Sequence, residues 1–273
     1  MTTWFAGVAA LRAAREPGVL VTITDVRGHA PREAGAKMVV SAATTWASIG
    51  GGNLEADAVT RARALLSAGG ARPESYPVRL SDKAPGPHGV QCCGGEVTVL
   101  LEPLPVVPAV AIFGVGHVGL ELARILARHD LDLHLVDSRE ESLSDAALAP
   151  LADAVAGVHV HHIPVIPELV LAELPPGTRV LVLTHDHAED FAIVDAALRC
   201  DHLGAIGLIG SSAKWARFRS RLVESLPAEV VDRVETPIGL AGLSTSKDPA
   251  AIAVSAAAAL LAAIEREETH AGR

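Results

Sequence analysis

The feature that most constrains the fold of this chain is a glycine-rich turn between an apolar run and a helix-like segment. The apolar run Ala111–Phe113 leads into Gly114–Gly119, whose glycines have the spacing GxGxxG. In such a turn Gly114 allows the tight bend, Gly116 lets the backbone approach a ligand, and Gly119 lets the helix pack close to the strand. The pattern predicts one βαβ unit of a Rossmann-type sheet.

The residues after the turn fit a ligand that carries phosphate. His117 and Val118 open the helix, where free N–H groups and the positive end of the helix dipole attract anions. Asp137 ends the next predicted strand, where a carboxylate commonly accepts from a ribose hydroxyl, and Arg139 leaves room for a 2′-phosphate. The turn predicts a phosphate or pyrophosphate site without identifying the ligand. A tight turn that binds nothing is the alternative.

The second half of the chain alternates between strands and helices, which implies a parallel sheet with helices on both faces. Strands are predicted at 110–113, 133–136, 158–163, 180–184 and 205–209, and helices at 118–128, 189–198, 212–226 and 249–264. The first half instead has an α+β pattern. Its predicted strands are 19–26, 37–41, 76–80 and 96–101, with two helices, one of which is placed at 54–67.

Three prolines separate these halves, and they can continue neither a helix nor a central strand. We therefore predict an α/β protein with an N-terminal α+β domain at 1–102, a linker at 103–108 and a Rossmann-like parallel-sheet domain at 109–273.

Charge and composition argue against some partners. Lys and Arg number 23 against 32 Asp and Glu, a formal charge of −9, which disfavours nucleic acid and anionic membrane surfaces. The three cysteines do not form a disulfide framework and no signal-like segment begins the chain, so we expect a cytoplasmic protein. The apolar segment at 250–264 is short for a bilayer and is predicted to be a buried helix.

Cys92 and Cys93 lie side by side in a glycine-rich segment. Adjacent cysteines lack the spacing of a zinc ribbon and seldom form an unstrained disulfide. A thiolate at this place could bind a soft metal centre or carry transferred sulfur. Two small buried residues at the entry to a strand are the alternative.

A second polar cluster, His185, Asp186 and His187, follows a strongly apolar strand. Ligands bind at the carboxyl ends of strands in a doubly wound sheet, so this cluster could bind a metal, transfer protons or donate to a phosphate. Alternatively, Asp186 is the N-cap of the next helix with Glu189 as its capping-box partner. Ser211 precedes another helix, and it either holds a second anionic group or caps that helix.

Several motifs, taken in order, give the chain a family resemblance. They are Arg27–Met38, Gly50–Glu55, Gln91–Gly95, Gly114–Gly119, Val136–Arg139, Thr184–His187, Gly207–Ser211, Thr236–Leu240 and Asp248–Ser255. Together they resemble the xanthine dehydrogenase accessory protein family, also called XdhC/CoxI, nearly from end to end. No single motif is diagnostic, whereas their shared order is specific.

The resemblance implies a chaperone for molybdenum cofactor that has no turnover of its own. Such proteins bind the cofactor, support its sulfuration by a cysteine desulfurase and pass it to a molybdenum hydroxylase of the xanthine dehydrogenase type. The family also implies a homodimer. On this interpretation Cys92 or Cys93 is a molybdenum ligand or a sulfur relay. The residues expected to bind the cofactor are Gly114, Gly116, His117, Val118, Gly119, Asp137, Arg139, His185, Asp186, His187 and Ser211.

Two other functions fit parts of the pattern. An NAD(P)-dependent oxidoreductase would use the same glycine-rich turn, with Asp137 favouring NAD and Arg139 accommodating NADP. In that case His185 or His187 would serve as a general acid. A metal-dependent hydrolase centred on His185, Asp186 and His187 is the third hypothesis.

Overall fold

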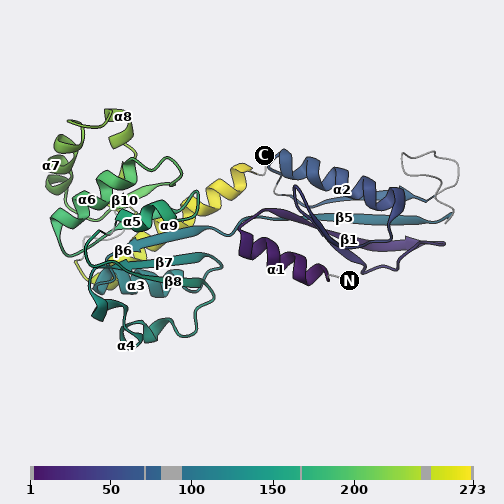
Figure 1. The fold of residues 1–273 in the computed structure, drawn as a ribbon, viewed down its shortest axis with the longest axis horizontal. Coiled ribbons are helices and arrows are strands. Elements are labelled where there is room, and N and C mark those ends of the chain that lie inside the picture. Colours follow the sequence, from purple (N-terminus) through teal and green to yellow (C-terminus); the bar gives the residue numbers. More distant parts are fainter. Residues whose placement is uncertain (1–2, 71, 81–93, 167, 241–246, 272–273) are drawn as a thin grey trace. The chain divides into compact units, whose positions relative to one another are not determined.

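The computed structural model describes residues 3–70, 72–80, 94–166, 168–240 and 247–271 (Figure 1). The chain divides into two compact units, one formed by Met1–Val106 with Glu265–Arg273 and the other by Val107–Ile264. The first unit contains an antiparallel sheet and the second a parallel one. The predicted fold class, an α+β part followed by a Rossmann-like part, is therefore confirmed.

The first unit is a five-stranded antiparallel sheet, in the order β3-β2-β1-β5-β4, with a helix on each face. Its elements are α1 (Trp4–Ala14), β1 (Gly18–Arg27), β2 (Lys37–Val40), β3 (Thr45–Ala47), α2 (Gly52–Ser67), β4 (Glu74–Arg79) and β5 (Glu96–Leu104). Alternate residues of β1, among them Val19 and Val21, are buried against α2. Helix α1 covers the opposite face, where Gly7 approaches Val39 and Trp46 (Figure 1).

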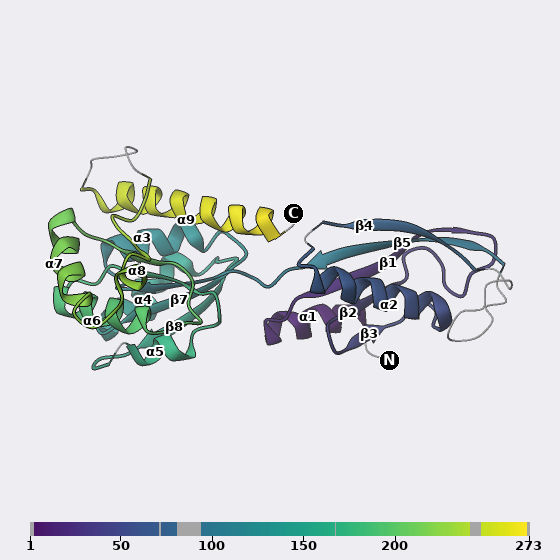
Figure 2. The same ribbon diagram turned by 90° about the horizontal axis from the view of Figure 1, so that it is seen from above.

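The second unit is a six-stranded parallel sheet in the order β11-β10-β9-β6-β7-β8. Its strands are β6 (Ala109–Phe113), β7 (Asp132–Asp137), β8 (Gly157–His162), β9 (Arg179–Val182), β10 (Ile206–Leu208) and β11 (Val234–Glu235). Its α-helices are α3 (His117–Leu126), α4 (Asp145–Leu148), α5 (Glu168–Glu173), α6 (His187–Leu198), α7 (Ser212–Leu222), α8 (Ala228–Val231) and α9 (Pro249–Ala271). Helices α3 and α9 cover one face, and α5, α6 and α7 cover the other (Figure 2).

The strand order reverses beside β6, which hydrogen-bonds to both β7 and β9. The chain runs outward from β6 through β7 to β8, then returns to β9 and continues the other way through β10 to β11. Open parallel sheets bind ligands outside the carboxyl ends of their strands at such a reversal. The segments that follow β6 and β9 therefore frame the candidate site.

The proline-rich segment differs from the predicted linker. Strand β5 continues to Leu104, and Pro103 is paired in register with Val19 of β1. Strand β4 ends its pairing opposite Leu101, so Pro103 has a neighbouring strand on one side only. A proline is tolerated there because an unpaired strand edge does not need its missing N–H.

Two helices differ from the sequence prediction. Of the two helices predicted in the first half, only one was placed, and the structure shows the second as α1, which Thr3 caps by accepting a hydrogen bond from the Ala6 amide at 3.2 Å. Helix α9 extends beyond residue 264. Its part Pro249–Glu267 is long and apolar enough to cross a membrane, but core helices of globular proteins can have the same length and composition. Length alone therefore does not argue against a membrane span. In the structure α9 contributes Ala257 and Leu260 to the core beneath the parallel sheet.

Candidate functional site

The glycine-rich turn joins the carboxyl end of β6 to the first turn of α3, and two of its glycines are required by packing. Gly114 has a φ of +104°, and a Cβ there would lie 2.4 Å from the carbonyl oxygen of Leu183. A Cβ on Gly119 would lie 2.0 Å from the carbonyl oxygen of Gly114. Cβ atoms do not approach backbone atoms so closely. Any side chain at either position would force the strand, turn and helix apart.

Gly116 is different, because nothing in its backbone or its packing demands a glycine. Its φ of −80° and ψ of −162° are open to any residue. The nearest atom to a Cβ built there is Nη2 of Arg139, at 3.8 Å. Gly116 is also the N-cap residue of α3 and has no side chain to cap it. The amides of the first helical turn therefore remain donors, and the space beside Gly116 suits an anion.

Asp137 lies beneath the turn, where its own neighbours bind both carboxylate oxygens. Oδ1 accepts hydrogen bonds from the backbone N–H and from Nε of Arg139, both at 2.9 Å. Oδ2 accepts from the Val115 amide at 2.7 Å and from Nη2 of Arg139 at 2.8 Å. These four bonds fill the acceptor positions of a carboxylate. The ribose contact predicted for Asp137 would require Arg139 to move away.

Electrostatics keep Asp137 and Arg139 both charged. Burial raises the pKa of Asp137, but hydrogen bonds from Arg139 and from the Val115 amide lower it by more, so its pKa falls below the ordinary value. The hydrogen bond to Asp137 raises the pKa of Arg139, and the charges of Glu141 and Glu189 add to this effect. The pair is therefore a fixed ion pair at neutral pH.

Arg139 is the cation that faces the open side of the turn. Its side chain is 32% exposed, whereas that of Asp137 is 2% exposed. Nε and Nη2 bind Asp137, and no hydrogen bond within the described part of the chain engages Nη1. Asp137 thus holds the guanidinium beside Gly116 and leaves part of it free to meet a ligand anion.

The segment after β9 forms the neighbouring wall, and its three predicted site residues have different roles. Asp186 is the N-cap of α6 and accepts hydrogen bonds from the amides of Ala188 at 2.6 Å and Glu189 at 3.0 Å. These bonds lower the pKa of Asp186. His185 and His187 are exposed. Asp186 is therefore the predicted N-cap, but its own amide donates to Oγ1 of Thr184 at 3.3 Å and not to Glu189, the predicted capping-box partner. The two histidines are the exposed side chains of this segment that remain available to a ligand.

Ser211 is also a cap. Its Oγ accepts a hydrogen bond from the Lys214 amide at 3.2 Å, which starts α7. The side chain is exposed beyond the carboxyl end of β10. Its predicted contact with a second anionic group stays a prediction.

The metal-binding hypothesis gains no support from the geometry. Within the residues that the structure describes, no group of three His, Cys, Asp or Glu side chains is arranged to hold a metal ion. His185 and His187 thus lack a third ligand among those residues. Cys92 and Cys93, the other predicted metal ligands, lie outside the described residues.

Sequence reasoning missed a buried ion pair behind this wall, between Asp190 of α6 and Lys214 of α7. The Asp190 side chain is 0% exposed and that of Lys214 is 7% exposed. The partners are 24 positions apart, so no local pattern reveals the pair. The available signal was a carboxylate on the apolar face of a predicted helix, because Asp190 has helical spacing with Ile193, Val194 and Ala197.

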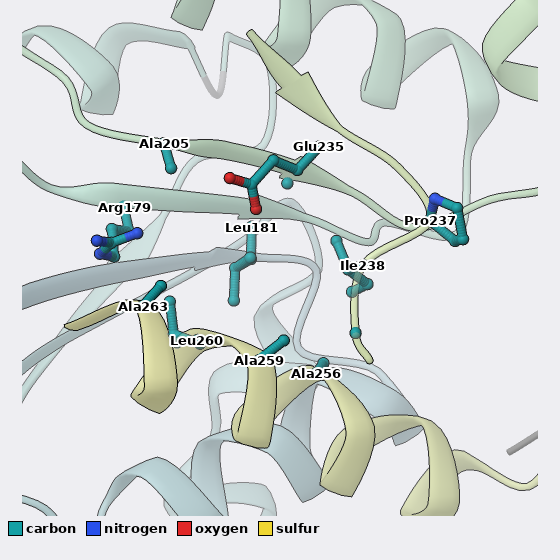
Figure 3. A pocket seen from close by; sticks show the side chains of 12 residues that line it. Arg179, Leu181, Ala205, Glu235, Pro237, Ile238, Ala256, Ala259, Leu260 and Ala263 are labelled. Atoms are coloured by element: carbon teal, nitrogen blue, oxygen red, sulfur yellow. The ribbon is translucent and has the colours of Figure 1, made fainter. Parts of the chain in front are cut away.

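The second unit also has a small cavity between the sheet and α9 (Figure 3). It is lined by Arg179, Leu181 and Glu235 from the sheet and by Ala256, Ala259 and Ala263 from the helix, among others. Its volume is about 70 Å³. Sites for drug-sized ligands occupy roughly 300–1,000 Å³. The cavity is therefore too small for a nucleotide or a pterin.

Comparisons with known proteins agree with this architecture. The XdhC Rossmann domain family matches residues 110–260, and the XdhC and CoxI family matches residues 11–77. The uncharacterized protein YqeB of Escherichia coli (strain K12) is 25% identical over 259 residues. That match covers 94% of this chain but only 45% of YqeB, so the chain spans about half the length of this relative.

Among solved structures, one described as a xanthine dehydrogenase from Bacillus halodurans is similar, with 20% sequence identity and a TM-score of 0.48. The similarity covers 97% of this chain and 96% of that one. The Rossmann-domain match alone includes more than half of the chain and contains the turn, Asp137, Arg139 and the β9 wall. The chain belongs to the XdhC family.

Proposed function

We propose that this chain takes part in the maturation of a xanthine dehydrogenase-type molybdenum hydroxylase, as a carrier of molybdenum cofactor with no turnover of its own. It would bind the cofactor, support its sulfuration by a cysteine desulfurase and insert it into the hydroxylase. Membership of the XdhC family supports this role. We further propose that the protein acts in the cytoplasm as a homodimer.

The observation that carries the proposal is the open position at Gly116. Among the described residues, and apart from the chain neighbours of Gly116, Nη2 of Arg139 is the one heavy atom within 4 Å of a Cβ built there, so the turn provides a cradle without a side chain of its own. Molybdenum cofactor ends in a phosphate, and its dinucleotide forms contain a pyrophosphate. The uncapped amides of α3 and the Arg139 cation fit such a group.

In this role the residues of the protein would hold and orient the cofactor. The cofactor would supply the molybdenum centre for hydroxylation in the recipient enzyme. The α3 amides and Arg139 would bind the phosphate end, with Asp137 keeping Arg139 in place. His185 and His187, exposed on the neighbouring wall, would donate to the bound molecule. Cys92 or Cys93 would act as a soft ligand or as a sulfur relay.

Co-purification tests the proposal. Protein isolated from cofactor-producing cells is expected to release an oxidised, fluorescent pterin, and the Cys92→Ala/Cys93→Ala variant is expected to release less. Cys200→Ala is the matched control. Its thiol is half-buried at the edge of the core, and burial raises its pKa, which disfavours the reactive thiolate. Folded wild-type protein without pterin would contradict cofactor binding. Equal pterin in the double variant would remove only the role of the two cysteines.

An NAD(P)-dependent oxidoreductase is the second candidate, favoured by the strand order and the position of the turn at its reversal. The full hydrogen bonding of Asp137 argues against a ribose contact at that residue. Titration with NADH and NADPH decides between the two candidates. Tight binding with a substrate-dependent change in nicotinamide absorbance would favour the oxidoreductase, and no binding at millimolar concentration would exclude it.

A further inference from the structure

The Asp190–Lys214 pair connects the loops at the carboxyl ends of two neighbouring strands. Nζ of Lys214 donates to Oδ2 of Asp190 and, at 2.9 Å, to the carbonyl oxygen of Ile209, which directly follows β10. Oδ1 of Asp190 accepts from the backbone N–H of Thr184 at 2.9 Å and from its hydroxyl at 2.8 Å. One buried carboxylate therefore fixes both the end of β10, through the lysine, and the segment after β9.

The segment held in this way lies directly against the glycine-rich turn. A Cβ on Gly114 would come within 2.6 Å of the Leu183 carbonyl carbon and within 2.7 Å of Thr184 Cα. Contacts therefore run without a break from Lys214 through Asp190 and Thr184 to the turn. Thr184 binds the carboxylate of the pair and lies against the turn, so we expect a change in the pair to reach the turn by way of Thr184.

Stability alone does not explain why such a pair lies in the core. Burying two charges is costly, and replacing a buried ion pair with apolar residues of similar volume is often neutral or stabilising. A buried pair does, however, select one arrangement of the segments that it joins, because every other arrangement leaves a charge without a partner. Here the joined segments are the end of β10 and the segment after β9, and the second of these lies against the glycine-rich turn.

We infer that Asp190 and Lys214 are positioning residues for the cofactor site. Their pair holds Thr184 against Gly114 and thereby sets where His185 stands relative to the turn. This inference rests on the proposed function for the identity of the ligand. The contact chain itself does not depend on that identity.

Two double variants that differ at one position test the inference. Asp190→Val with Lys214→Met removes both charges and the acceptor for Thr184. Asp190→Asn with Lys214→Met also removes both charges but keeps an amide oxygen where Thr184 donates. Single substitutions are unsuitable because they leave one buried charge unpaired and unfolding would confuse the result.

Two quantities are measured on folded protein: hydrogen exchange at the Thr184 amide and pterin content after purification from cofactor-producing cells. In the valine double variant we expect faster exchange at Thr184. Its pterin content should fall at least about tenfold, as when the groups that support a ligand site are removed. The asparagine double variant should fall between the valine variant and the wild type in both quantities, because it keeps an acceptor for Thr184 but loses the lysine that holds this acceptor in place. Thermal unfolding checks that both variants are folded.

Unchanged Thr184 exchange in the valine variant would overturn the inference, as would wild-type pterin content in that variant. Equal loss in both variants would also overturn it, because the effect would then not pass through Thr184. If the wild-type protein contains no pterin, the proposed function fails. Exchange at Thr184 then decides by itself whether the pair positions the loop.

Discussion

Gly116→Ala is expected to abolish cofactor retention while changing the free energy of unfolding by no more than about 1 kcal/mol, the scale of a change at an N-cap. The backbone at Gly116 suits alanine, and the added methyl group meets no atom closer than Nη2 of Arg139 at 3.8 Å. The same methyl group occupies the space through which a phosphate would approach the amides of α3. Pterin content and urea unfolding measure the two effects.

Gly119→Ala is the matched control, because it adds the same methyl group three residues later. For this variant we expect a loss of stability, whereas for Gly116→Ala we expect a loss of cofactor with little change in stability. Its Cβ would lie 2.0 Å from the carbonyl oxygen of Gly114, so the protein should lose about 1–3 kcal/mol of stability or fail to fold. Wild-type pterin content in Gly116→Ala would place the cofactor elsewhere. A large loss of stability in Gly116→Ala would show that the position is structural.

The turn was predictable from the sequence because its determinants are local. Strand β6 is a continuous apolar run, and Gly114 and Gly119 stand at the positions where strand, turn and helix pack together. The parallel sheet follows from the alternation of strands and helices along the chain. In the first unit, by contrast, β1 pairs with β5 across about seventy intervening residues, and no local pattern reveals that pairing.

The rest of the site depends on side-chain choices and on distant partners. Spacing places Asp137 at the end of β7, but whether it accepts from a ligand or from Arg139 depends on the conformation of the arginine two residues later. The Asp190–Lys214 pair joins two helices that lie on the same face of the sheet. It can be recognised only from the structure, because its partners are far apart in the sequence. Sequence thus located the glycine-rich turn of the candidate site, whereas the structure identified the charged side chains beside it.

Asp137→Ala is expected to lower the free energy of unfolding by about 1–3 kcal/mol at neutral pH, the cost of leaving a buried hydrogen-bond donor without its acceptor. The substitution deprives the Val115 amide of its acceptor and leaves the Arg139 guanidinium without its carboxylate. Asp232→Ala is the control, since Asp232 also binds an arginine, Arg219, but does so at the surface. Its loss should change stability far less, because solvent screens an exposed ion pair.

The effect of Asp137→Ala should also depend on pH, with a sign that the lowered pKa of this carboxyl determines. A carboxyl group whose pKa is lower in the folded state stabilises the protein above its unfolded pKa, about 3.9 for Asp, and loses that contribution as pH falls through the folded value. The difference in the free energy of unfolding between wild type and Asp137→Ala should therefore be largest at neutral pH and shrink below about pH 4. Urea unfolding at a series of pH values measures this difference. A gap that stays constant into the acid range would mean that Asp137 contributes by packing rather than by charge, and Arg139 would then need another anchor beside Gly116.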